Sequence, residues 1–217
     1  MTQETWLIIA VFLGYFILHS LTASLWLKQH VAARWPAAVP YYRLAFNLLA
    51  SITALPLVYL AWRYPGDPLW QWQGLAFYLV NALALLALVT LLYSTRLYDM
   101  DEFLGLRQVR GTIQNIHDQE HFQISPFHRY VRHPWYFLIL VIIWTRDIST
   151  HQLLIYSLVT AYLVAGSRME ERKLIAYHGN VYREYRKRVA GLFPLPWKIL
   201  SRAEAEQLIS DYEEGKG

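Results

Sequence analysis

Long apolar blocks separated by short polar segments dominate this chain of 217 residues. The first three blocks, about residues 6–27, 42–62 and 74–97, can each cross a hydrocarbon core of about 30 Å as a helix that rises about 1.5 Å per residue. Only 17% of the residues are charged, against about a quarter in an ordinary soluble domain. The pattern therefore predicts an integral membrane protein, because a helix satisfies its own backbone hydrogen bonds in lipid.

Two further apolar blocks, residues 134–146 and 150–167, are less easily assigned. The first of them is too short to cross the bilayer without help from its flanks. Either the two form a tight hairpin, or both are full spans whose ends begin in the interfacial zone, and we favour the two spans. The expected fold is one all-α polytopic domain over residues 1–217, with about five transmembrane helices.

The placement of lysine and arginine predicts the orientation. These residues follow the first and third blocks and fill the C-terminal tail, whereas residues 64–73 and 146–150 have almost no net positive charge. The positive-inside rule then puts the N-terminus outside and the C-terminus in the cytoplasm. It also accounts for the net charge of +4, so we expect membrane lipid and not nucleic acid as a partner. The chain has no cysteine, which excludes disulfides, thiolate metal sites and a cysteine nucleophile.

Residues 114–136 pack four histidines, His117, His121, His128 and His133, against the start of an apolar block. Imidazole is a common metal ligand. However, the histidine spacings form no tight pair, and no carboxylate stands at a ligand spacing as in His-Glu-x-x-His. We predict no metal site, and the simplest alternative is a set of solvated interfacial residues.

The segment Arg168–Lys173 directly follows the last block, so Glu170 and Glu171 lie at or just under the membrane surface. Ionisable groups at that depth are usually paired or functional. Arg132 is a plausible partner for one of them. A stop-transfer cluster is the alternative explanation, although such a cluster needs cations and not carboxylates.

Residues 174–189 show an apolar spacing of three to four with cations between. They predict an amphipathic helix on the cytoplasmic leaflet, interrupted or bent at Gly179. With residues 114–136 and 168–194 brought together, the cytoplasmic face would offer cations, a carboxylate and aromatic rings. S-adenosylmethionine would suit these groups, although the groups alone do not select that cofactor.

Several spaced motifs resemble the signature of the isoprenylcysteine carboxyl methyltransferase superfamily. They are Tyr130-Val-Arg-His-Pro-Trp-Tyr136, Met169-Glu-Glu-Arg-Lys-Leu174, the run His178-Gly-Asn-Val-Tyr-Arg-Glu-Tyr-Arg-Lys-Arg-Val189, and Pro194. In the N-terminal half, His19-Ser20 and Tyr42–Ala50 look more like two bacterial branches, the methanethiol S-methyltransferases and a denitrification-associated membrane family. The resemblance implies an enzyme of the bacterial cytoplasmic membrane that uses S-adenosylmethionine.

The resemblance also implies which residues would hold the cofactor. They are Gln114, His121, Phe122, Gln123, Ile124, His128, His133, Pro134, Trp135, Tyr136 and Glu170. His128 stands where the superfamily usually has tyrosine, and the stretch Ser125–His128 requires a gap of one residue.

By the same resemblance, His133 and Tyr136 would bind the methionine carboxylate, and Glu170 its ammonium. Arg132, supported by Glu171, would orient the acceptor or hold it as an anion. Arg168 is the cation nearest to the position of an arginine that contacts substrate in the isoprenylcysteine enzymes. His19 is a candidate for generating a thiolate, with a hydrogen bond between helices as the slightly favoured alternative.

The expected acceptor is a small lipophilic molecule: a thiol is favoured, and an isoprenylcysteine carboxylate or a phospholipid amine is possible. The competing hypothesis is a non-enzymatic membrane protein that binds a lipid or a haem-like ligand.

Overall fold

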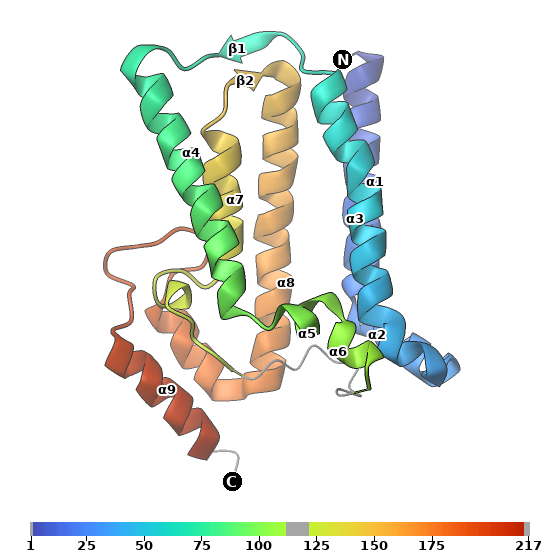
Figure 1. Cartoon of the computed structure of the whole chain (residues 1–217), viewed down its shortest axis with the longest axis vertical. Coiled ribbons are helices and arrows are strands. Elements are labelled where there is room, and N and C mark those ends of the chain that lie inside the picture. Colours follow the sequence, from blue (N-terminus) through green and yellow to red (C-terminus); the bar gives the residue numbers. More distant parts are fainter. Residues whose placement is uncertain (1, 112–121, 215–217) are drawn as a thin grey trace. The chain divides into compact units, whose positions relative to one another are not determined.

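The computed structural model describes residues 2–111 and 122–214, and most of these are helical (Figure 1). The chain forms two compact units. The first unit comprises Met1–Gln71, Tyr98–Gln119 and Asp147–Leu158, and the second comprises Trp72–Leu97, Glu120–Arg146 and Val159–Gly217. The predicted all-α polytopic class is consistent with this architecture, in which the described strands are limited to one short pair.

The first unit contains, in chain order, α1 (Gln3–Ala23), α2 (Leu25–Arg34), the 3₁₀ turn η1 (Pro36–Ala38), α3 (Val39–Arg63), β1 (Pro68–Trp70), α5 (Met100–Leu104), α6 (Leu106–Val109), β2 (Ile148–Ser149) and the start of α8 (Thr150–Arg188). Helices α1 and α3 pack together. Tyr42 at the start of α3 donates a hydrogen bond of 2.6 Å to the carbonyl of Thr22 near the end of α1. The strands β1 and β2 pair antiparallel.

The predicted first span, residues 6–27, differs from the helix that forms. Helix α1 ends at Ala23, because Ser24 has an extended backbone with φ −72° and ψ 144°. The Ser24 hydroxyl then accepts a hydrogen bond of 3.2 Å from the amide of Leu27 and caps α2. A serine at this position is a preferred N-cap, so the break has a local cause in the sequence.

Among the described residues, three helical segments are long and apolar enough to cross a membrane: Gln3–Ala23, Pro36–Arg63 and Gly74–Leu97. Many of their large apolar side chains are exposed, Ile17 and Leu75 among them, as lipid-facing residues are. The chain is therefore membrane-embedded by length and composition. The predicted fourth block forms the shorter apolar helix α7 (Pro134–Trp144), which at about 1.5 Å per residue spans about 16 Å. The total of five spans stays a prediction.

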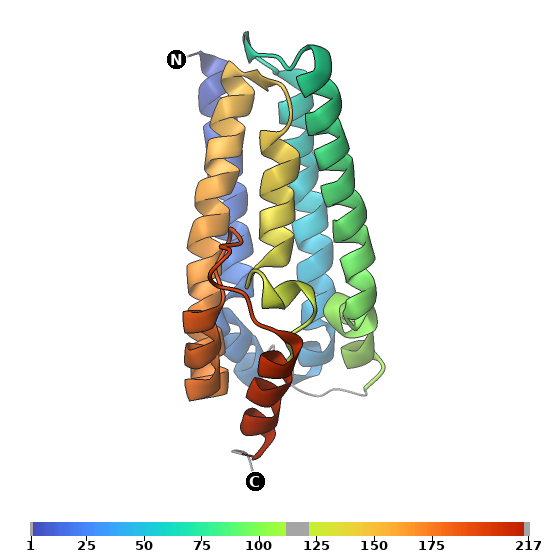
Figure 2. The ribbon, with the colours of Figure 1, turned by 90° about the vertical axis from the view of Figure 1, so that its left-hand side faces the viewer.

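The second unit contains α4 (Gly74–Ser94), the 3₁₀ turns η2 (Thr95–Leu97) and η3 (Phe127–Arg129), α7, the remainder of α8, and α9 (Arg202–Glu214). Helices α4 and α7 lie side by side, green and yellow in Figures 1 and 2. Two hydrogen bonds of 2.7 Å join them. Trp135 donates to Ser94 near one end of α7, and Arg146, just past the other end, donates to Asn81. Trp144 donates to Thr160 and links α7 to α8.

Helix α8 continues well beyond the predicted block 150–167, to Arg188, with a kink at Gly179. The backbone of Gly179 has φ 59° and ψ −129°, a conformation suited to glycine, so the predicted interruption there is confirmed.

The apolar face of the tail after this kink does not face lipid as predicted. Tyr182, Tyr185 and Val189 are buried in a core cluster with Phe122 and residues of the C-terminal segment, Leu200 and Leu208. Helix α9, red in Figure 2, contributes Leu208 and covers part of this face. The periodicity identified the apolar face, but it could not show that a later helix of the same chain covers it.

Gly105 has a left-handed backbone, with φ 91°, between α5 and α6. A Cβ atom at this position would lie 2.6 Å from the backbone nitrogen of Leu44. Arg43 and Asn47, on the same helix α3, donate hydrogen bonds to the carbonyl of Phe103. Glycine at 105 therefore lets the α5–α6 segment approach α3.

We predict that Gly105→Ala lowers the free energy of unfolding by about 1–3 kcal/mol, the usual cost of forcing a side chain into a strained backbone. Thermal unfolding in detergent measures the effect. Gly14→Ala is the control, because Gly14 lies in α1 and a Cβ there meets no described atom within 4 Å. An equal effect of both substitutions would contradict the prediction.

Candidate functional site

The start of α7 is fastened to the segment that follows α8. The backbone amides of Arg132 and His133 donate hydrogen bonds of 2.8 and 3.1 Å to the carbonyls of Ala190 and Gly191. Pro134 then occupies the first turn of α7, where its fixed φ is compatible with a helix and its missing N–H is not needed. The side chains of Arg132 and His133 are thereby held at a defined place in the second unit.

Arg132 and Glu171 form an ion pair in which each side chain is about nine-tenths buried. Nε and Nη2 of Arg132 lie 2.8 and 2.6 Å from Oε1 of Glu171. Nη1 donates to the carbonyls of Arg186 and Val189. The predicted pairing of Arg132 with one of the two glutamates is therefore present, and the guanidinium is directed at the protein interior.

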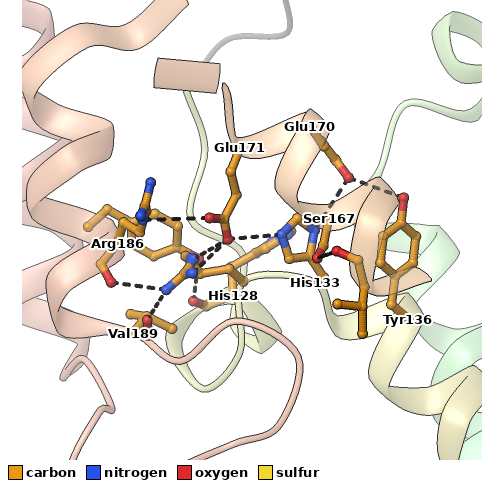
Figure 3. Close-up of polar contacts among 11 residues, drawn as sticks. His128, His133, Tyr136, Ser167, Glu170, Glu171, Arg186 and Val189 are labelled. Atoms are coloured by element: carbon orange, nitrogen blue, oxygen red, sulfur yellow. Dashed lines mark hydrogen bonds and ion pairs between the residues drawn. The ribbon is translucent and has the colours of Figure 1, made fainter. Parts of the chain in front are cut away.

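His133 extends this pair to the second glutamate (Figure 3). Its Nε2 lies 3.2 Å from Oε1 of Glu171, and its Nδ1 lies 3.4 Å from Oε2 of Glu170. Burial alone would lower the pKa of His133, but the hydrogen bonds to Glu170 and Glu171 outweigh it and raise that pKa to about 8. For Glu171, burial alone would raise the pKa, but the hydrogen bonds from His133 and Arg132 lower it to about 2. The charged forms of both groups are thus favoured near neutral pH.

Glu170 differs from its neighbour in exposure. Consecutive residues of a helix point about 100° apart, so Glu171 is buried while the side chain of Glu170 remains 47% exposed. Tyr136 donates a hydrogen bond of 3.2 Å to Oε2 of Glu170, and the Tyr136 ring stacks on His133 with 5.3 Å between centroids. Glu170 is therefore a fixed, accessible carboxylate that can accept a cation.

His128 belongs to the turn η3, just before this group in the chain. Its Nδ1 is 2.8 Å from the hydroxyl of Ser125, and its backbone carbonyl accepts a hydrogen bond of 2.7 Å from Tyr185. Burial, reinforced by the charge of His133, lowers the pKa of His128 to about 4. His128 is consequently a neutral hydrogen-bonding group at neutral pH.

The structure distributes the other predicted cofactor residues more widely. Phe122 is buried in the core cluster, Ile124 packs against that cluster, and Gln123 is exposed. Pro134 is buried, and Trp135 bonds to Ser94 on α4. Gln114 and His121 lie outside the described residues.

Two further predicted catalytic residues, Arg168 and His19, belong to different units of the chain. Arg168 is exposed on α8 and lies three residues before Glu171. His19 lies in α1 of the first unit, with its ring near those of Tyr15 and Phe46. Among the residues described, no group of three His, Cys, Asp or Glu side chains could hold a metal ion.

Arg186 and Gly191 are members of the site that the sequence did not reveal. Nε of Arg186 lies 3.6 Å from Oε2 of Glu171, and a Cβ on Gly191 would lie 3.3 Å from Nη2 of Arg132. The only available signal was a cation among many in the tail and a glycine just after it. Nothing in that pattern singles out these two positions, because each role depends on a tertiary contact, of Arg186 with Glu171 and of Gly191 with Arg132.

We predict that Arg132→Ala lowers the free energy of unfolding by about 3 kcal/mol or more, the usual cost of leaving one member of a buried ion pair without its partner. Arg110→Ala is the matched control, because Arg110 pairs with Asp101 at an exposed position. An exposed pair contributes less than about 1 kcal/mol. Chemical denaturation in detergent compares the two, and similar losses would contradict a structural role for Arg132.

The protonation of His133 predicts a pH dependence of stability. A pKa raised in the folded state gives stability that is complete below about pH 6.5, the ordinary histidine value, and is lost as the pH rises through about 8. We therefore expect the melting temperature of the wild type to fall over this interval. His133→Gln should remove that component of the fall, and parallel curves for the two proteins would contradict the assignment.

Comparison with known proteins gives related sequences. The methanethiol S-methyltransferase of Crocosphaera subtropica is 32% identical over 191 residues, which cover 84% of this chain and 72% of the relative. Methanethiol S-methyltransferase 2 of Bradyrhizobium diazoefficiens is 34% identical, over 83% of this chain and 69% of the relative. The methanethiol S-methyltransferase of Mycobacterium tuberculosis is also 34% identical, over 86% and 77%.

No family model matches the chain, and no solved structure matches it. The sequence relatives confirm the resemblance to the methanethiol branch, which His19-Ser20 and the stretch Tyr42–Ala50 indicate. With identity above 30% along most of both sequences, the chain belongs to the methanethiol S-methyltransferase family.

Proposed function

We propose that the chain transfers a methyl group from S-adenosylmethionine to methanethiol or a closely related small thiol. The relatives' names supply the reaction and the thiol. The observation that carries the proposal to this chain is the half-exposed carboxylate of Glu170, held between His133 and Tyr136. The competing non-enzymatic hypothesis has no comparable support.

The described residues fit the ammonium group of this cofactor. A carboxylate fixed by two hydrogen-bonding neighbours binds an ammonium with little reorganisation, and charge-assisted hydrogen bonds are about twice as strong as neutral ones. Glu170 is such a group, and Tyr136 offers an aromatic ring beside it. When bound, S-adenosylmethionine supplies a methyl group that is already activated by a positively charged sulfur.

For His133 and Arg132 we propose positioning roles. Both ring nitrogens of His133 face carboxylates, so this side chain is better suited to fixing Glu170 than to binding the methionine carboxylate. Arg132 directs Nε, Nη1 and Nη2 at Glu171 and the carbonyls of the tail. These contacts favour a role in holding Glu171 and His133 in place over direct contact with the acceptor.

The acceptor chemistry requires little from the protein beyond positioning and the exclusion of water. The thiol sulfur forms a bond to the methyl carbon while the bond from that carbon to the cofactor sulfur breaks, and the thiol proton leaves. The product from methanethiol is dimethyl sulfide. His19 remains the proposed candidate for assisting loss of that proton, and Arg168 the proposed candidate for contacting the acceptor.

The site is proposed to face the cytoplasm of a bacterial cell, with the N-terminus outside. The support is the excess of Lys and Arg around residues 168–188. A thiol dissolved in the bilayer would then approach from the membrane side, and membrane lipid would be the surrounding partner.

We predict that the protein purified in detergent binds S-adenosylmethionine and forms dimethyl sulfide from methanethiol. Glu170→Gln should weaken cofactor binding at least tenfold. A hydrogen bond to a charged group contributes about 1.5–3 kcal/mol, and about 1.4 kcal/mol is a tenfold change in affinity. Calorimetry measures the affinity, and gas chromatography measures the product.

Glu184→Gln is the matched control, because Glu184 is a glutamate of similar exposure on the same helix α8 and pairs with Lys187. It should leave the affinity unchanged. Absence of dimethyl sulfide with saturating cofactor would overturn the proposed reaction. Equal affinity of wild type and Glu170→Gln would overturn only the assignment of the ammonium.

A further inference from the structure

Gly166 occupies a distinctive position on α8. It lies four residues after Tyr162 and four residues before Glu170, and residues four apart in a helix lie on the same face. Along the helix axis, Gly166 and Glu170 are about 6 Å apart at about 1.5 Å per residue. Gly166 is therefore one helical turn from the carboxylate that anchors the proposed site.

The local structure gives no reason for glycine at this position. A Cβ built on Gly166 meets no described atom within 4 Å, and its backbone φ is not positive. Glycine inside a helix is less stable than alanine by roughly 0.5–1 kcal/mol. Neither packing nor backbone geometry compensates this cost, so the open space in front of Gly166 is the property that requires explanation.

Open space alone carries no conclusion, because Gly14 on α1 shares it. The surroundings distinguish Gly166. Tyr136, from the neighbouring helix α7, donates a hydrogen bond to Glu170, as Figure 3 shows. Tyr162 lies one turn before Gly166 on the same face of α8. The open space therefore lies on α8 one turn from Glu170, the residue to which Tyr136 donates its hydrogen bond.

We propose that the space in front of Gly166 receives the alkyl group of the methyl acceptor, and that the absence of a side chain at 166 sets the size of thiol that the site admits. This proposal rests on the proposed function. In S-adenosylmethionine, three carbon atoms join the ammonium to the sulfur that carries the methyl group. When the ammonium is bound at Glu170, the sulfur with its methyl group is only three carbon atoms away. That distance is comparable with the rise of one helical turn, which separates Glu170 from Gly166.

The ligand chemistry that fits is a small uncharged thiol. The residues of α8 between Tyr162 and Glu170 are uncharged, apart from the exposed Arg168. A hydrophobic site discriminates by size, with one methylene worth roughly 10- to 200-fold in kcat/KM. A side chain added at 166 should therefore penalise longer thiols most.

The experiment compares methanethiol, ethanethiol and 1-propanethiol as acceptors for the wild type, Gly166→Ala and Gly166→Leu. We expect Gly166→Leu to lower the ratio of kcat/KM for propanethiol over methanethiol at least tenfold, with Gly166→Ala between it and the wild type. Gly14→Leu is the control and should leave the ratio unchanged. An unchanged ratio in both Gly166 variants would overturn the proposal.

A second measurement does not depend on turnover. With S-adenosylhomocysteine in place of the cofactor no methyl can be transferred, so the rise in melting temperature on adding 1-propanethiol reports acceptor binding alone. We expect this rise in the wild type and a loss of it in Gly166→Leu; an equal rise in both would overturn the proposal. If the wild type methylates no thiol, the proposed function fails, whereas thiol methylation with an unaltered size ratio makes this inference alone fail.

Discussion

A buried charge is costly unless an opposite charge and hydrogen bonds compensate it at the same place. In the second unit, the ion pair of Arg132 with Glu171 provides this compensation and brings several segments together. Arg132 precedes α7, Glu171 lies within α8, and the carbonyls of Arg186 and Val189 that complete its contacts lie at the end of the α8 tail. Segments up to 57 positions apart in the chain therefore converge on one guanidinium. Gly191 permits the close approach because it has no side chain.

Two adjacent glutamates perform different tasks because a helix turns between them. Glu171 faces inward and is neutralised by its cationic neighbours, whereas Glu170 faces outward and keeps an accessible carboxylate. His133 links the two, so the buried pair fixes the position of the exposed group. A site built in this way separates stability from ligand binding: loss of Arg132 should affect folding, and loss of Glu170 should affect the ligand.

Much of this arrangement can be predicted from the sequence, and the features that cannot be predicted have a physical reason. Apolar length predicts α4, and a glycine in a polar helix predicts the kink at Gly179. The cost of charge at a membrane surface predicts that Arg132 pairs with a glutamate. In contrast, periodicity shows that the tail has an apolar face without showing that α9 covers it. The part played by Arg186 depends on tertiary contacts that no local pattern encodes.

The unequal lengths of α4 and α7 have a consequence for the bilayer. Arg146, just past the end of α7, bonds to Asn81, which lies seven residues inside α4 and hence about 10 Å from its start. A bilayer thick enough to match α4 is too thick for α7, which is a hydrophobic mismatch between two neighbouring helices. The hydrogen bond to Asn81 gives the guanidinium of Arg146 a protein partner at that depth, so the polar end of the shorter helix is compensated within the second unit.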